Sequence, residues 1–141
     1  MDKQFRFVVD ANILFSAILK KEWKTNSILF SPIVDFFVPD FLFTELQKYE
    51  QLFAKKLFLY REYVMNFLAR GITVYPTQFM ENDIFAVQDI VNVVDPKDTI
   101  YVALAYKLQI PLQTNDKKLK DNLDIVKIVN TEEIVSILGM I

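Results

Sequence analysis

Short runs of apolar residues alternate along the chain with longer segments in which apolar positions recur every three to four residues. The short runs are typical of buried strands and predict strands at residues 5–9, 36–38, 72–74, 111–114 and 125–129. The periodic segments predict helices at 11–19, 26–30, 41–56, 57–70, 78–91 and 99–108, and a last helix that begins at Thr131. Because strands and helices alternate, we expect an α/β fold: a doubly wound α/β/α sandwich around a mostly parallel sheet of four to five strands.

The segment at residues 94–119 places an acidic residue on each side of one helix–strand unit. Asp98 precedes the helix at 99–108, which is apolar nearly all round and should therefore be buried. The strand at 111–114 follows, and Asp116 comes directly after it. In a parallel sheet a helix begins at the edge where strands end, so both acids should lie at that edge. Proteins of the α/β class bind ligands there.

Two further acids should reach the same edge of the sheet. Asp10 directly follows the first predicted strand, and Glu45 lies in the first turns of the helix after the second strand. Each acid alone has an ordinary explanation, as a helix cap, a turn residue or a solvated helix position. Carboxylates that gather at short range repel one another, however, and are usually brought together around a hard cation. We therefore predict a metal site formed by Asp10, Glu45, Asp98 and Asp116.

The residue types that the chain lacks narrow its chemistry. It has no Cys and no His, which excludes thiol nucleophiles, zinc-finger sites and histidine-based acid–base catalysis. It has only two glycines, which excludes a glycine-rich phosphate-binding loop. A metal would be held by oxygen ligands, which favours Mg²⁺ or Mn²⁺. The net charge of −2 argues against a whole-surface attraction to nucleic acid and leaves a local one open.

Length and hydropathy bear on organisation and location. The chain has 141 residues, 52% of them hydrophobic, and we expect residues 1–141 to form a single domain. Since no apolar run approaches 18 residues, we expect no membrane span. Residues 1–4 lack the basic-then-apolar order of a secretion signal, so a cytoplasmic location is expected.

Four motifs occur in an order that resembles the PIN-domain nucleases, a family that includes the VapC-like ribonuclease toxins. They are FVVDANIL at 7–14, the helix with Glu45, DPKD at 95–98 ahead of an Ala- and Leu-rich helix, and TND at 114–116. The resemblance runs from Phe5 to Leu138. It implies that Asp10, Glu45, Asp98 and Asp116 match the family's acidic quartet around Mg²⁺ or Mn²⁺. The implied activity is hydrolysis of RNA phosphodiester bonds.

Other residues near the four acids are candidates for supporting roles. By the resemblance, Thr114 matches a hydroxyl residue that often precedes the last acid, and Asn12 matches the polar residue after the first. Asn115 lies between Thr114 and Asp116. Asp95 is expected mainly to shape the turn beside Pro96, because proline favours the start of a helix.

Basic and aromatic residues suggest contacts with larger partners. Lys117, Lys118 and Lys120 adjoin the last acid and could hold RNA phosphates as point charges, although a solvated face explains them equally well. Family members often carry an acid where this chain has the first two lysines, which leaves the number of metal ions open. The segment 41–70 has more aromatic residues than a helix pair can bury against a sheet. The resemblance implies a homodimer or an antitoxin peptide there.

The mechanism that the residues allow agrees with that activity, and two other functions compete with it. Phosphodiester hydrolysis needs an activated water and neutralised phosphoryl charge, and a carboxylate-held Mg²⁺ supplies both without histidine. The main alternative is a PIN-like module that binds RNA or protein with weak or no turnover. A phosphoryl-transfer domain of the receiver or phosphatase type also places acids at strand ends. It is disfavoured because Ala11 and Asn12 follow Asp10, where phosphatases have a second Asp.

Overall fold

The computed structural model describes residues 5–20 and 22–139, and at its centre is a five-stranded sheet in which every pair of neighbours runs parallel. The strands are β1 (Phe5–Val9), β2 (Val34–Pro39), β3 (Thr73–Tyr75), β4 (Leu112–Gln113) and β5 (Ile128–Val129), in the order β3-β2-β1-β4-β5. The predicted α/β class and strand number are confirmed, and the sheet is wholly rather than mostly parallel. The last two strands are shorter than predicted because β4 and β5 pair through two residues each.

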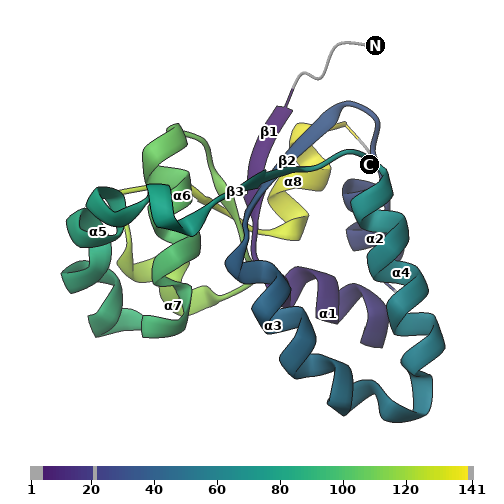
Figure 1. The fold of residues 1–141 in the computed structure, drawn as a ribbon. Helices are drawn as coiled ribbons and strands as arrows, with labels where there is room; N and C mark the ends of the chain where they lie inside the picture. The colour runs from purple at the N-terminus through teal and green to yellow at the C-terminus, as the bar shows by residue number, and fades with distance from the viewer. Residues whose placement is uncertain (1–4, 21, 140–141) are drawn as a thin grey trace.

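Helices cover both faces of the sheet. They are α1 (Ala11–Lys20), α2 (Trp23–Leu29), α3 (Phe41–Glu50), α4 (Leu57–Ala69), α5 (Glu81–Val94), α6 (Thr99–Leu108), α7 (Lys117–Asn122) and α8 (Thr131–Ile137). Short 3-10 turns lie at Gln51–Lys56, Thr77–Phe79 and Pro96–Asp98. In Figure 1, α5, α6 and α7 lie to one side of the strands and α1, α2 and α4 to the other, which is the predicted sandwich.

Several predicted helices differ from the structure in extent, such as the one expected at 26–30, which begins earlier, at Trp23, and one helix was not predicted. The helix expected at 41–56 ends at Glu50, because a 3-10 segment follows from Gln51 to Lys56 and the backbone leaves helical geometry within it, at Phe53 (φ −99°, ψ 22°). The helix expected from residue 78 begins at Glu81, after a 3-10 turn behind Pro76. Helix α7 was not predicted, since Leu119 is its one buried residue and gives no apolar period.

The core lies around β1 and α6. Val8 and Val9 of the central strand are fully buried, and α6 packs against β1, β2 and α5. This position between the sheet and another helix explains why α6 is apolar nearly all round. Within the described residues, no helix has the length and apolarity needed to cross a membrane. The single-domain extent and the cytoplasmic location remain predictions, and residues 1–4, on which the latter rests, lie outside the described part.

The strand order reverses at the centre of the sheet. From β1 the chain builds outward through β2 to β3, then returns so that β4 pairs with the other side of β1, with Val8 opposite Leu112. In open α/β sheets such a reversal leaves a crevice at the carboxyl ends of the two strands. The fold therefore places a potential binding site between the ends of β1 and β4.

Candidate metal centre

The carboxyl ends of β1 and β4 each deliver an aspartate to this crevice. Asp10 follows β1 directly, and its backbone N–H donates to the carbonyl of Gln113 in β4 at 3.3 Å. Asp116 follows β4 and is the N-cap of α7. Asp98 arrives at the same edge because α6 must begin there to run back to the start of β4. Three of the four predicted acids, Asp10, Asp98 and Asp116, therefore lie at one edge of the sheet.

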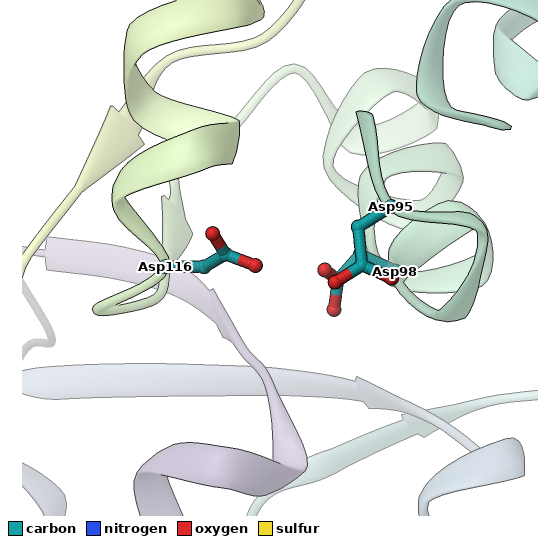
Figure 2. Close-up of side chains that lie close together, drawn as sticks. All are labelled: Asp95, Asp98 and Asp116. Atoms are coloured by element: carbon teal, nitrogen blue, oxygen red, sulfur yellow. The ribbon is translucent and has the colours of Figure 1, made fainter. Parts of the chain in front are cut away.

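Asp95, Asp98 and Asp116 form a tight carboxylate cluster. Each offers one oxygen, and the three oxygens lie within 4.8 Å of one another. Figure 2 shows Asp116 pointing toward Asp95 and Asp98 from the opposite side, from the segment that leads into α7. Asp95 was expected mainly to shape the turn before α6; it shapes that turn and also belongs to the cluster.

Three of the aspartates use one oxygen in the same way. Oδ1 of Asp10 accepts a hydrogen bond from the Asn12 amide at 2.5 Å. Oδ1 of Asp95 accepts from the Lys97 amide at 3.2 Å, and Oδ1 of Asp116 from the Lys118 amide at 2.9 Å. In each case the donor is two residues further along, which is the geometry of an Asx-turn or helix cap. The second oxygen of each carboxylate stays outside this bond, so capping and metal binding are compatible.

Asp98 is the acid on which the other charges converge. Its side chain is buried, and burial, followed by the charges of Asp10, Asp95, Asp116 and Glu45, raises its pKa to about 8. Repulsion from four other carboxylates means that all of them lie within electrostatic range of this one group. Such an arrangement stabilises a proton or a cation at Asp98.

Asp10 has a buried oxygen without a partner. Burial raises the pKa of this residue to about 6 although the neighbouring Thr114 side chain acts to lower it, and among the described residues its Oδ2 accepts no hydrogen bond of normal geometry. An unpaired buried carboxylate oxygen is costly unless a proton or cation satisfies it. An all-oxygen donor set with an orphaned oxygen fits a hard cation such as Mg²⁺ or Mn²⁺.

Glu45 lies beside the cluster and brings further residues into the site. It is half-buried on α3, burial raises its pKa, and its Oε1 accepts a hydrogen bond from the phenol of Tyr101. Lys48 and Lys97 are close enough for their charges to offset part of that rise. No sequence pattern singles out Tyr101, Lys48 or Lys97. Spacing is the one signal in the sequence that could have indicated two of them: Tyr101 is three residues after Asp98, and Lys48 is three residues after Glu45.

Thr114 and Asn115, which were expected to support the site, accept hydrogen bonds that fix the loop between β4 and α7. Thr114 is buried, and its hydroxyl accepts a hydrogen bond from the Asp116 amide at 3.1 Å, which fixes the start of α7. The side-chain oxygen of Asn115 accepts from the Thr131 amide at 3.0 Å and so ties this loop to α8. A pocket of about 300 Å³ adjoins the cluster. It is lined by Asn12, Ile13, Ser16, Thr114, Asn115 and Asp116.

The three candidate RNA-contacting lysines fall into two groups. Lys117 and Lys118 are exposed in the first turn of α7, directly after Asp116. Lys120 forms an ion pair with Glu133 of α8 and also donates to the carbonyl of Ile128 at 3.4 Å. Its ammonium group is therefore directed to α8 and β5 rather than left free for a phosphate.

A wholly parallel sheet with a carboxylate cluster at its topological switch point defines an α/β protein with an acidic group that could hold a cation through oxygen ligands. Comparison with protein families then gives the particular family: the PIN domain model matches residues 8–135, and the chain belongs to the PIN-domain family. The resemblance drawn from the sequence motifs is thereby confirmed. No curated protein matches the chain by sequence.

Solved structures share this fold. VapBC2 of Rickettsia felis, bound to a promoter DNA fragment, is 19% identical with a TM-score of 0.67, over 89% of this chain and 98% of that chain. DNA-bound VapBC of Salmonella typhimurium is 16% identical with a TM-score of 0.68, over 91% and 99%. A protein of Pyrobaculum aerophilum is 14% identical with a TM-score of 0.64, over 100% of both chains. At these identities the likeness establishes the fold alone.

Proposed function

We propose that this protein is a Mg²⁺- or Mn²⁺-dependent endoribonuclease that hydrolyses single-stranded RNA at the carboxylate site. One observation supports this most strongly: Asp10, Glu45, Asp95 and Asp116 all act electrostatically on the buried Asp98. A protein that assembles five acids in one place, without a histidine or cysteine anywhere in its sequence, is suited to metal-assisted hydrolysis. Membership of the PIN-domain family supports the same reaction class.

The cation would be held first by Asp95, Asp98 and Asp116, whose oxygens already lie together. Asp10, through its unpaired Oδ2, and Glu45 are the nearest additional carboxylates. When bound, Mg²⁺ or Mn²⁺ lowers the pKa of a coordinated water and neutralises charge on the phosphoryl oxygens.

The remaining tasks fall to side chains of the chain itself. Glu45 has one oxygen bonded to Tyr101, and we assign its other oxygen, Oε2, to accept a proton from the attacking water. Lys117 and Lys118 are exposed beside Asp116 and would hold flanking phosphates as point charges. Lys97 is exposed on the opposite side of the cluster, between Asp95 and Asp98, and would act in the same way.

We also propose that the protein is the cytoplasmic toxin of a toxin–antitoxin pair and forms a homodimer. Two proteins of the same fold are VapBC complexes bound to DNA, which supports an antitoxin partner. Helix α4 and the turn before it expose an apolar surface, as expected for a partner site. We call it the α4 surface; it consists of Leu52, Phe58, Leu59 and Met65.

Cleavage of a generic single-stranded RNA, with and without divalent metal, tests the reaction. We expect cleavage with Mg²⁺ or Mn²⁺ and none in EDTA, because the chain has no histidine and a carboxylate alone is too weak a base to activate water without a cation. Full activity in EDTA would contradict the mechanism. The alternative of a PIN-like module without turnover predicts RNA or protein binding but no cleavage at any Mn²⁺ concentration.

A further inference from the structure

A buried tyrosine connects two of the elements that supply the acids. Tyr101 is 2% exposed and lies on α6, three residues after Asp98 and so on the same side of that helix. Its phenol donates a hydrogen bond to Oε1 of Glu45 on α3. Its ring packs against Phe41, also on α3, with 6.4 Å between the ring centroids and an interplanar angle of 63°. Phe41 and Glu45 are four residues apart, so one face of α3 contacts both ends of the tyrosine.

Core packing alone does not explain why the Tyr101 hydroxyl bonds a carboxylate. A buried tyrosine hydroxyl needs an acceptor, and a backbone carbonyl is sufficient. Tyr60 of α4 shows this simpler solution against the same helix α3, because its hydroxyl donates to the carbonyl of Leu46 at 2.7 Å. Tyr101 instead bonds a carboxylate whose charge acts on Asp98. The two tyrosines thus hold neighbouring residues of α3, one by its backbone and the other by its acidic side chain.

The hydrogen bond from Tyr101 keeps the Glu45 carboxylate close to the other acids, although their charges repel it. Glu45 has a flexible side chain, and repulsion from the other acids would drive its carboxylate toward solvent. A neutral O–H donor on the rigid, buried helix α6 holds one oxygen in place and adds no charge to the site. The other oxygen, Oε2, then keeps a defined position beside the cluster.

We propose that Tyr101 is a positioning residue that holds Glu45 against the acid cluster, so that this carboxylate is in place for cation binding and proton acceptance. The inference rests on the proposed function of the site. Groups that orient the ligands of a metal commonly change metal affinity or activity by about 10- to 100-fold when they are removed.

The first test measures Mn²⁺ affinity by electron paramagnetic resonance in the absence of RNA. We expect Tyr101→Phe to weaken Mn²⁺ binding by about 10-fold or more. The matched control, Tyr60→Phe, removes from α4 a buried hydroxyl that bonds only the backbone of α3, and it should leave the affinity unchanged. In a Glu45→Ala background, Tyr101→Phe should have no additional effect, because the side chain that it positions is absent. Unchanged affinity in Tyr101→Phe, or the same loss with and without Glu45, would overturn the proposal.

The second test separates positioning from folding through the kinetics of RNA cleavage. We expect kcat to fall by about 10- to 100-fold in Tyr101→Phe with little change in KM, since the RNA-contacting lysines are untouched. Circular dichroism verifies the fold, and Tyr101→Met provides a second variant without the hydroxyl. A loss of melting temperature equal to that of Tyr60→Phe, with unchanged kcat and Mn²⁺ affinity, would assign Tyr101 to the core. Coupling in the Mn²⁺ measurement without any RNA cleavage would refute the ribonuclease proposal and leave the role of Tyr101 intact.

Discussion

Asp10 and Asp116 hold the starts of two different helices by the same bond, in which Oδ1 accepts from the backbone amide two residues later. In both residues the other oxygen remains outside the capping bond. An asparagine can keep the capping bond through its side-chain oxygen while it removes the negative charge. Asp→Asn substitutions therefore separate the structural role of these residues from the chemical one.

The first prediction concerns Asp10→Asn. We expect the rate of RNA cleavage to fall by several orders of magnitude, because the negative charge is lost and, with the Asn oxygen kept in the capping bond, an NH2 group that cannot coordinate a cation replaces the unpaired Oδ2. The far-ultraviolet circular dichroism spectrum should remain native, since the bond to the Asn12 amide is retained. Loss of the native spectrum would instead mean that the charge of Asp10 is required for folding.

The second prediction concerns Asp98→Asn, melted in EDTA and in Mn²⁺. Without metal, the variant should melt higher than the native protein, because a neutral amide avoids the cost of either protonating or charging a buried carboxyl among other acids. Relief of one pKa unit corresponds to about 1 kcal/mol. Added Mn²⁺ should stabilise the native protein by mass action and the variant much less. Equal shifts in both proteins would remove Asp98 from the metal site.

The third prediction is the pH dependence of the metal-free protein. The pKa of Asp98 is about 8 in the folded state and near its ordinary value of 3.8 when unfolded, so between these values the native state binds more protons. The free energy of unfolding should therefore fall as pH rises from about 4 to 8. Urea denaturation in EDTA across this range measures it, with Asp98→Asn as the control that should flatten the curve. Parallel curves for the two proteins would contradict the raised pKa.

The fourth prediction divides the lysines of α7. In the inactive Asp10→Asn background, replacing Lys117 and Lys118 by Ala should weaken RNA binding. The salt dependence, d log K/d log[salt], should become shallower by roughly 1.4, since each phosphate contact contributes about 0.7. Lys120→Ala should leave that slope unchanged and lower stability by at most about 1 kcal/mol, because its ion pair with Glu133 is partly exposed. A similar loss of slope in Lys120→Ala would place that lysine on the RNA path.

The fifth prediction concerns association through the α4 surface. Light scattering should give a dimer mass for the native protein and a monomer mass for the double variant Phe58→Ser, Met65→Ser. The control is Phe85→Ser, which changes an equally exposed aromatic on α5, across the sheet from α4 (Figure 1). A monomer at high concentration of the native protein would rule out a stable homodimer, although an antitoxin could still bind there.

Sequence reasoning worked best where chain order alone determines position. Alternating strands and helices lead to a parallel sheet, and a parallel sheet brings Asp10, Glu45, Asp98 and Asp116 to one edge. The role of Asp95 was harder to predict, because the neighbouring Pro96 already explained an acid at that turn. An acid beside a proline can be a turn residue, a site residue or both, and only the fold distinguishes these cases.

Tyr101 could not be recognised from the sequence for a different reason. An aromatic residue in an apolar helix is ordinarily a core residue, and Tyr101 is indeed buried. Its hydroxyl partner lies 56 residues earlier in the chain, on a separate helix. No periodicity connects residues at that separation, so this contact emerges only from the packing of α3 against α6.

The position of β4 beside β1 determines when the acid cluster can form during synthesis of the chain. Asp10 and Glu45 leave the ribosome early, but Asp98 and Asp116 belong to the last third of the chain. The cluster cannot assemble until the segment from Asp98 to Asp116 has emerged and β4 has paired with β1, more than 100 residues away in sequence. Domains fold as units during synthesis, and pairing over such distances comes late. On the proposed function, a nascent chain would therefore lack a complete site, and would not cleave RNA, until the segment through Asp116 has emerged and β4 has paired with β1.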